Sequence, residues 1–119
     1  MRLKEIDIQR QCSDFLALDG WRLLRTDPVS DRRRGKGFGE IGMADCLYIR
    51  YGPILPAAEV LWCEFKRPGG KLSPHQIRWA QEETARGGLV WLATWTFEPT
   101  FEGFVAHYRA SGLLRRQGL

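Results

Sequence analysis

The stretch that decides the fold reads WCEFKRPGGKLSPHQ and covers residues 62–76. Its beginning completes a run from Glu59 to Lys66 that is rich in aromatic and aliphatic side chains, which predicts a strand. Near its end Ser73 precedes Pro74, and Gln76 follows three residues after the serine, which is the pattern of a capped helix start. The chain therefore leaves a strand, crosses a proline- and glycine-rich loop and enters a helix.

Patterns on both sides of this stretch predict the other elements. Apolar residues at helical spacing predict helices, and short apolar runs bounded by turn residues predict strands. In chain order the predicted elements are a helix over Lys4 to Leu18, strands over Trp21 to Thr26, Ala44 to Tyr51 and Glu59 to Lys66, a helix from Ser73 to the Gly87-Gly88 pair, a strand over Leu89 to Trp95 and a helix from about Pro99 to Ala110. This α-β-β-β-α-β-α order predicts an α/β fold, with one mixed sheet flanked by helices, in a single domain over residues 1–119.

The composition argues against several classes of protein. The chain of 119 residues is 44% apolar and has five tryptophans, which is enough to build one core. The sequence shows neither a signal-peptide pattern nor an apolar run of membrane-spanning length, so we expect a cytoplasmic protein. Three cysteines at wide spacing, without a CxxC pair and with only two histidines, argue against a disulfide scaffold or a zinc site.

The basic residues are clustered along the chain. Residues 27–42 are rich in glycine and arginine and lack periodicity, which predicts a loop or hairpin. Most runs of charge form only a solvated surface, but here the neighbouring glycines allow close approach to a phosphate backbone. The side chains that we expect to contact nucleic acid are Arg32, Arg33, Arg34, Lys36, Arg67 and Lys71. Clustering of this kind indicates a polyanionic partner.

Two carboxylates and a lysine are predicted to meet at one end of the sheet. Residues two apart in a strand share a face, so Glu64 and Lys66 lie side by side. Asp45 begins the neighbouring run, and antiparallel pairing would bring it to the same end. Carboxylate oxygens and the main-chain carbonyl of Phe65 would suit Mg²⁺ or Mn²⁺, and a lysine beside them suits phosphodiester hydrolysis. Without a metal ion, the facing carboxylates would tend to take up a proton.

An alternative is that Glu64 and Lys66 form the solvated polar face of an edge strand, since a Glu-x-Lys tripeptide often occurs by chance. Their surroundings favour the catalytic interpretation. Asp45 follows a glycine-rich loop, the Glu64 strand is flanked by apolar residues, and its exit leads directly into a capped helix.

These motifs also resemble a known family. The sequences GMAD (residues 42–45) and EFKRPGGKLSPHQ (residues 64–76), with Trp79 and Gly88 beyond them, are similar to the virus-type replication-repair nuclease domain, VRR-NUC. That family is a branch of the PD-(D/E)XK nuclease superfamily, and the resemblance covers nearly the whole chain. Ala44 stands where the family often has a proline before the metal-binding aspartate.

The resemblance implies roles for two further residues. Glu5 matches an acidic residue of the family's first helix, and it lies within the apolar arc of the predicted helix, where a carboxylate is unusual. Its alternative role is a first-turn glutamate favoured by the helix dipole. Gln76 matches an active-site residue oriented by Ser73 and Pro74, and its alternative role is the capping box alone.

The resemblance also implies an activity, which is metal-dependent cleavage of DNA by a PD-(D/E)XK core. Stand-alone members of the family resemble homodimeric enzymes that resolve Holliday junctions in DNA repair, and they are often encoded by phages or prophages. A phage-infected or bacterial cytoplasm would then be the setting. The alternatives are a catalytically inactive nucleic-acid-binding module of the same fold and a restriction-type or RNA-directed endonuclease.

The remaining aromatic and apolar residues predict a core and a subunit interface. We expect the tryptophans to be mostly core rather than platforms for base stacking, and His75 and His107 to be non-catalytic. A dimer interface would use apolar surface left exposed once the sheet is covered, unless those residues fold back onto their own core. The candidates are Tyr51, Ile54 and Leu55 in the segment from Tyr48, and Phe101, Phe104 and Tyr108 in the last helix.

Overall fold

The computed structural model describes residues 4–25, 40–54 and 57–119. Within these ranges the order of elements is the predicted one. The elements are α1 (Glu5–Leu18), β1 (Arg22–Arg25), β2 (Cys46–Tyr51), β3 (Ala58–Glu64), α2 (Pro74–Ala85), β4 (Val90–Leu92) and α3 (Phe101–Ala110). Two strands end earlier than predicted: β3 stops at Glu64 rather than Lys66, and β4 stops at Leu92 because residues 94–96 form a turn.

The four strands form one mixed sheet in the order β1-β2-β3-β4. β2 pairs antiparallel with both β1 and β3, with Cys46 opposite Cys63. β4 pairs parallel with β3, and Glu64 lies beside Leu92. A parallel neighbour needs a crossover connection, which α2 provides. The carboxyl ends of β3 and β4 therefore lie at the same edge of the sheet as the start of β2.

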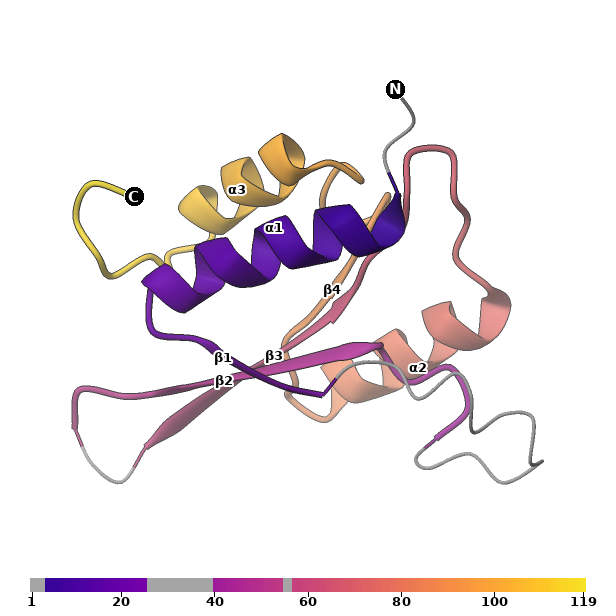
Figure 1. Ribbon diagram of the computed structural model, residues 1–119. Coiled ribbons are helices and arrows are strands. Elements are labelled where there is room, and N and C mark those ends of the chain that lie inside the picture. Colours follow the sequence, from indigo (N-terminus) through magenta and orange to yellow (C-terminus); the bar gives the residue numbers. More distant parts are fainter. Residues whose placement is uncertain (1–3, 26–39, 55–56) are drawn as a thin grey trace.

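The helices lie in two layers on opposite faces of the sheet (Figure 1). α1 and α3 cover one face, where Phe65 contacts Phe104 of α3 at a ring-centroid distance of 5.7 Å. α2 lies on the other face, where Trp62 contacts Trp79 at 5.0 Å. The predicted alternation along β3 is thereby confirmed, because neighbouring side chains reach different helical layers.

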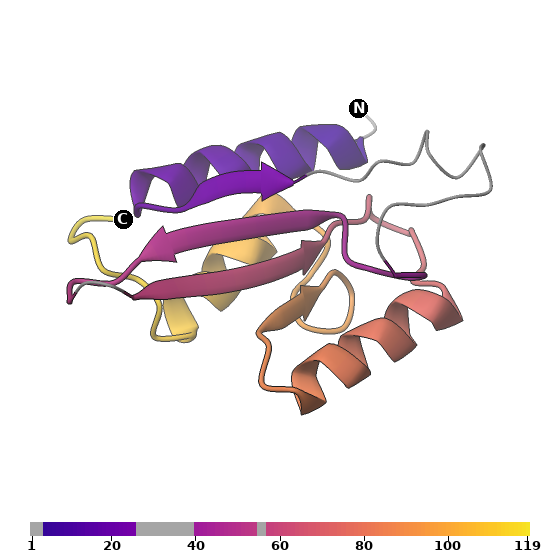
Figure 2. The ribbon, with the colours of Figure 1, turned by 90° about the horizontal axis from the view of Figure 1, so that it is seen from below.

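α2 covers only the β4 side of its face, and β1 and β2 stay open there (Figure 2). Leu24, Tyr51 and Val60 are exposed on this face. One neighbour of each along its strand lies on the covered face, and these neighbours are Leu23, Arg50 and Leu61. Ile54 is exposed as well. The prediction that α3 offers an interface is wrong for Phe104 and Tyr108, because both side chains are fully buried in the chain's own core. Leu55 lies outside the described residues.

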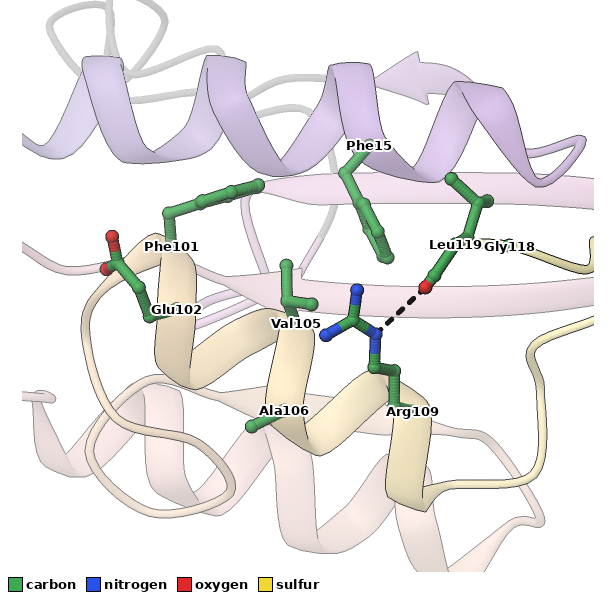
Figure 3. Close-up of a pocket in the computed structure, with 8 residues that line it drawn as sticks. All are labelled: Phe15, Phe101, Glu102, Val105, Ala106, Arg109, Gly118 and Leu119. Carbon is green, nitrogen blue, oxygen red and sulfur yellow. Dashed lines mark hydrogen bonds between the residues drawn. The ribbon is translucent and has the colours of Figure 1, made fainter.

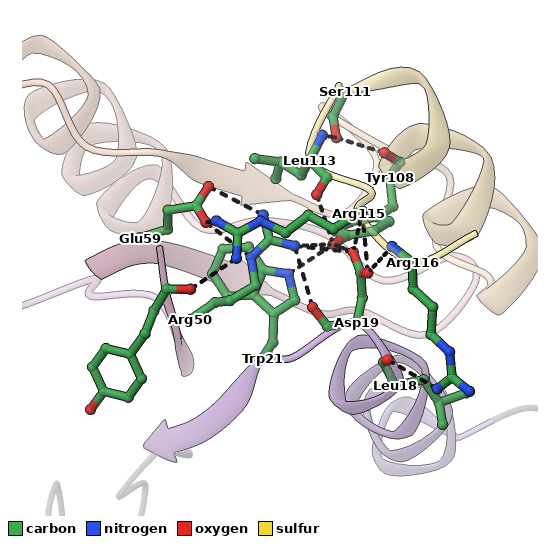
Figure 4. Close-up of polar contacts among 11 residues, drawn as sticks. Leu18, Asp19, Trp21, Arg50, Glu59, Tyr108, Ser111, Leu113, Arg115 and Arg116 are labelled. Carbon is green, nitrogen blue, oxygen red and sulfur yellow. Dashed lines mark hydrogen bonds and ion pairs between the residues drawn. The ribbon is translucent and has the colours of Figure 1, made fainter. Parts of the chain in front are cut away.

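A buried ion-pair network closes the end of the sheet away from Asp45 (Figure 4). Arg50 donates to both Asp19 and Glu59 at 3.0 Å and lies 4.5 Å above the ring of Trp21. Asp19 also accepts hydrogen bonds from the Tyr108 hydroxyl and from the main-chain amides of residues 115 and 116. These contacts attach residues 115–116 to the end of α1.

A pocket of about 460 Å³ lies between α1 and α3 (Figure 3). Phe15 and Val105 supply apolar walls, and Nε of Arg109 donates a 2.9 Å hydrogen bond to the main-chain oxygen of Leu119. None of the residues that line it belongs to the predicted site. In the described ranges, no helix combines the length and the apolar character needed to cross a membrane.

Candidate active site

The segment before Asp45 is fixed against the first turn of α2. Gly42 has a φ of +81°, and a Cβ atom there would lie 2.2 Å from the main-chain oxygen of His75. Only glycine combines this left-handed backbone with such a close approach. Nearby, Nε1 of Trp79 donates a 2.9 Å hydrogen bond to Oε1 of Glu40. These two contacts determine where the chain enters β2, and therefore where Asp45 lies.

Asp45 and Glu64 lie together across the β2–β3 pairing. Cys46 is opposite Cys63, which brings the preceding Asp45 next to Glu64. The main-chain N–H of Asp45 donates a 3.2 Å hydrogen bond to Oε1 of Glu64. The predicted convergence of these two residues is confirmed.

The carboxyl group of Glu64 is buried and only half satisfied. Its side chain is 1% exposed. Among the described residues, its Oε2 is the buried side-chain oxygen that has no hydrogen-bond partner, and Nζ of Lys66 lies 3.9 Å away. Burial and the negative charge of Asp45 raise the pKa of Glu64 to about 9, against an opposing effect of Lys66. Without a metal ion, this group therefore holds a proton at neutral pH even with Lys66 beside it.

Lys66 and Phe65 follow Glu64 beyond the end of β3. The Phe65 side chain is buried in the core and anchors the main chain at this point. The Lys66 side chain is 18% exposed, so its ammonium group reaches Glu64 while staying accessible from outside. The edge-strand alternative is wrong, because β3 is an inner strand between β2 and β4, and Glu64 is buried.

Glu5, in the first turn of α1, lies near the same group of carboxylates. Burial is the main reason that the pKa of the Cys46 thiol is raised, and the charges of Asp45, Glu64 and Glu5 add to that rise. All three carboxylates are therefore close enough to Cys46 to affect the pKa of its thiol. They come from α1, the start of β2 and the end of β3. The structure brings Glu5 toward the predicted site, and its role there stays a prediction.

Gln76 forms the capping box of α2. Its Oε1 accepts a 2.8 Å hydrogen bond from the Ser73 amide, and Oγ of Ser73 accepts one of 3.1 Å from the Gln76 amide. The capping role is therefore confirmed. An active-site role would use the side-chain amide nitrogen of Gln76, and it stays a prediction.

The surroundings of the site are suited to an anion. The N-termini of α1 and α2 both lie at the end of the sheet where β3 finishes (Figure 2), and helix N-termini favour negative ligands. Arg67 and Lys71 lie in the loop between β3 and α2, and both are exposed. The other basic residues that we expect to contact nucleic acid, Arg32, Arg33, Arg34 and Lys36, lie outside the described residues.

The available donors fit a hard divalent cation. Over the described ranges, no group of three or more histidine, cysteine, aspartate or glutamate side chains is arranged to hold a metal ion. The predicted set needs only two such side chains, Asp45 and Glu64, together with the carbonyl of Phe65. All three donors are oxygen, which Mg²⁺ and Mn²⁺ prefer. The unpartnered Oε2 of Glu64 is the observation that favours a cation here.

Two features of the structure were not predicted from the sequence. Gly42 was recognised only as part of a motif, since its contact with α2 is not visible in the chain order. Arg50 was not singled out, although the alternation of β2 gave a signal: Cys46, Tyr48 and Arg50 lie two apart, and all three are buried. An arginine on the inner face of a strand indicates a buried carboxylate partner.

Comparison of the chain with protein-family models, with curated proteins and with solved structures gives no significant match. The functional interpretation therefore depends on the residues of this chain and their arrangement.

Proposed function

We propose that this chain is an endonuclease that hydrolyses phosphodiester bonds in DNA with Mg²⁺ or Mn²⁺. The observation that carries the proposal is the Glu64 carboxyl group, which is buried beside Asp45 with one oxygen unpartnered. A protein gains no stability from such a group, because an unsatisfied buried polar atom costs about 1–3 kcal/mol. Groups of this kind are concentrated at functional sites. The resemblance of the motifs to VRR-NUC domains supports the same activity.

Asp45, Glu64 and the main-chain carbonyl of Phe65 would hold the metal ion. A cation beside Oε2 of Glu64 would supply the interaction that this oxygen lacks. It would also lower the pKa of Glu64, so that both carboxylates carry charge together. When bound, the ion lowers the pKa of a water molecule and withdraws charge from the phosphate.

Lys66 orients the attacking water and offsets the negative charge that develops on the phosphate. Its ammonium group lies 3.9 Å from Oε2 of Glu64, so it could contact a water molecule or phosphate oxygen beside that carboxyl group. The buried Phe65 holds the main chain beside it, so the point from which the Lys66 side chain extends is fixed. Gln76 and Glu5 would act as further polar contacts to water or phosphate.

The DNA backbone would cross the end of the sheet where β3 finishes. The N-termini of α1 and α2 favour a phosphate there, and Arg67 and Lys71 add positive charge in the β3–α2 loop. Such contacts position the backbone but do not read sequence. We therefore propose selection by DNA structure rather than by sequence, as in an enzyme that resolves branched DNA during repair in phage or prophage biology.

Cleavage assays on labelled linear, flap and four-way DNA test this proposal. The purified chain should cut at least one of these substrates when Mn²⁺ or Mg²⁺ is present, and should cut none of them with EDTA. Binding without cleavage under all metal conditions would instead favour the inactive nucleic-acid-binding module.

We further propose that the chain acts as a homodimer, because symmetric cutting of a branched duplex needs two sites related by a two-fold axis. The open sheet face would form the interface, since Val60 lies on the same side of β3 as Glu64 and is exposed, as are Leu24 and Tyr51. Light scattering should give a dimer mass for the chain and a monomer mass for Val60→Glu. A monomer at micromolar concentration would contradict the dimer and leave the nuclease proposal standing.

A further inference from the structure

The turn that follows β4 is strained and tightly held. Thr94 has a φ of +74°, a conformation that β-branched residues rarely adopt. Its amide donates a 2.7 Å hydrogen bond to the main-chain oxygen of Phe97. Thr96 closes the turn, because its Oγ1 accepts a 2.9 Å bond from the Leu92 amide. Strain of this kind persists only where surrounding contacts impose it, and it is concentrated at functional sites.

This turn lies at the same end of the sheet as Glu64. The Ala93 amide donates a 2.9 Å hydrogen bond to the main-chain oxygen of Glu64, and Leu92 is paired with Glu64 in the parallel ladder. The strained turn begins directly after these residues. It is therefore adjacent to the point where β3 continues into Phe65 and Lys66.

Trp95 lies at the centre of the turn and is exposed, unlike the other four tryptophans. Its side chain is 60% exposed, whereas Trp21, Trp79 and Trp91 are at most 5% exposed and Trp62 packs on Trp79. The expectation that the tryptophans are mostly core is therefore confirmed, and Trp95 is the exposed exception. Trp95 contributes little to the core, and the hydrogen-bonded turn holds it beside the site. Its indole is therefore available to contact a ligand.

We propose that Trp95 stacks on an unpaired base next to the phosphate that is cleaved, and so selects DNA with unpaired or branched segments. The proposal rests on the nuclease function above, which places the DNA backbone at this end of the sheet. A base within an intact duplex is stacked on both faces, whereas an unpaired base can offer one face to an indole. Stacking of this kind is independent of base identity, in agreement with selection by structure.

Binding without catalysis tests the proposal directly. Fluorescence anisotropy in EDTA would compare a fully paired duplex with the same duplex carrying a single-stranded flap. For Trp95→Ala we expect flap affinity to fall roughly 10-fold, as for the loss of one stacked base, and duplex affinity to stay unchanged. Trp95→Phe should keep most of the flap affinity. Leu18→Ala is the matched control, because Leu18 is 53% exposed at the end of α1 away from the site, and it should bind both substrates as the wild type does.

The outcomes separate this proposal from the nuclease proposal. Equal flap affinity for the wild type and Trp95→Ala would overturn the stacking role, and so would an equal loss for flap and duplex, which indicates a general backbone contact. A monomer mass for Trp95→Ala with unchanged flap preference would assign Trp95 to a subunit interface instead. If the wild type binds flap DNA through Trp95 but never cleaves with Mn²⁺, the nuclease proposal fails and the stacking role stands. If the wild type binds no DNA, both proposals fail.

Discussion

The main-chain N–H of Asp45 donates a 3.2 Å hydrogen bond to Oε1 of Glu64, while Oε2 of the same carboxyl group has no hydrogen-bond partner. The neighbouring strands β2 and β3 thus bring two acidic residues together at one end of the sheet, and of the two Glu64 oxygens only Oε1 accepts a hydrogen bond from the protein. The free energy that this arrangement costs can be measured.

Glu64→Gln should stabilise the metal-free protein at alkaline pH. The pKa of Glu64 is raised from its ordinary value near 4.5 to about 9, so the folded state binds one proton more than the unfolded state between these values. Its contribution to stability is fully present below pH 4.5 and is lost as the pH rises toward 9. In denaturant unfolding with EDTA, the variant should match the wild type at pH 5 and exceed it by about 1–3 kcal/mol at pH 9.

Mn²⁺ supplies the control for this experiment. A cation that binds only the folded state raises the melting temperature of the wild type, and loss of one carboxylate ligand should greatly reduce that rise in Glu64→Gln. A variant that is less stable than the wild type at pH 9, or that gains equally from Mn²⁺, would contradict the assigned environment of Glu64.

Gly42→Ala should damage the site far more than a glycine substitution in open space. Both Gly42 and Gly69 have positive φ, so alanine at either position costs about 1 kcal/mol in backbone strain. At Gly42 the new Cβ would also meet the main chain of His75 at 2.2 Å, whereas at Gly69 it would meet nothing within 4 Å. We expect Gly42→Ala to lose about 1–3 kcal/mol more than Gly69→Ala in thermal or denaturant unfolding. Equal losses would show that the Asp45 loop does not pack on α2.

Much of the fold was predictable from local patterns. The capping sequence at Ser73 and the alternation along residues 59–66 act through neighbours in the chain, so α2 and β3 were correctly predicted. The pairing of Asp45 with Glu64 followed as well, because antiparallel strands joined by a short connection have few possible registers.

Features that depend on distant contacts were not predictable. Arg50 reaches Asp19 and Tyr108 across the core, and no local pattern identifies its partners. The burial of Phe104 and Tyr108 depends on how α3 packs against α1, and therefore the choice between two apolar segments as an interface stayed open. The exposure of Trp95 depends on the turn over residues 94–96, where the sequence predicted that the strand from Leu89 continues to Trp95.

Gln76→Glu should separate the capping role of Gln76 from a role in cleavage. Glutamate at this position also forms a capping box with Ser73, so the variant should keep the stability of α2. Gln76→Ala removes the reciprocal hydrogen bond and should cost about 0.5–2 kcal/mol, the range for loss of a cap. If Gln76 contacts the substrate, both variants should cleave more slowly, because glutamate lacks the amide donor and adds negative charge. Normal cleavage by Gln76→Glu would limit the residue to capping.

Arg50→Ala should destabilise the fold without changing cleavage per folded molecule. It leaves the 1% exposed carboxylate of Asp19 without its ion pair, and loss of one partner of a buried pair costs about 3–5 kcal/mol. Arg50 lies at the end of β2 opposite Asp45, so the rate measured at a temperature where the variant is folded should equal that of the wild type.

The acid dependence of stability checks the same network. Burial raises the pKa of Asp19, but the hydrogen bonds from Tyr108 and two main-chain amides, with the charge of Arg50, outweigh burial and lower it. Hydrogen bonds from Arg50 are the main reason that the pKa of Glu59 is lowered. Both groups therefore stabilise the fold above the ordinary carboxyl range, and this is lost as the pH falls through their lowered pKa values. Arg50→Ala should lose less stability than the wild type between pH 5 and pH 2, and an unchanged acid dependence would contradict the network.

The most direct test of the central claim is the single-turnover cleavage rate of flap or four-way DNA in Mn²⁺. It would be measured for the wild type, Asp45→Asn, Glu64→Gln and Lys66→Ala at matched folded concentration. We expect the wild type to cleave and each variant to be slower by orders of magnitude, because each substitution removes a metal ligand or the charge beside the phosphate. A wild-type cleavage rate in any of the three variants would contradict the assignment of Asp45, Glu64 and Lys66 as the active site.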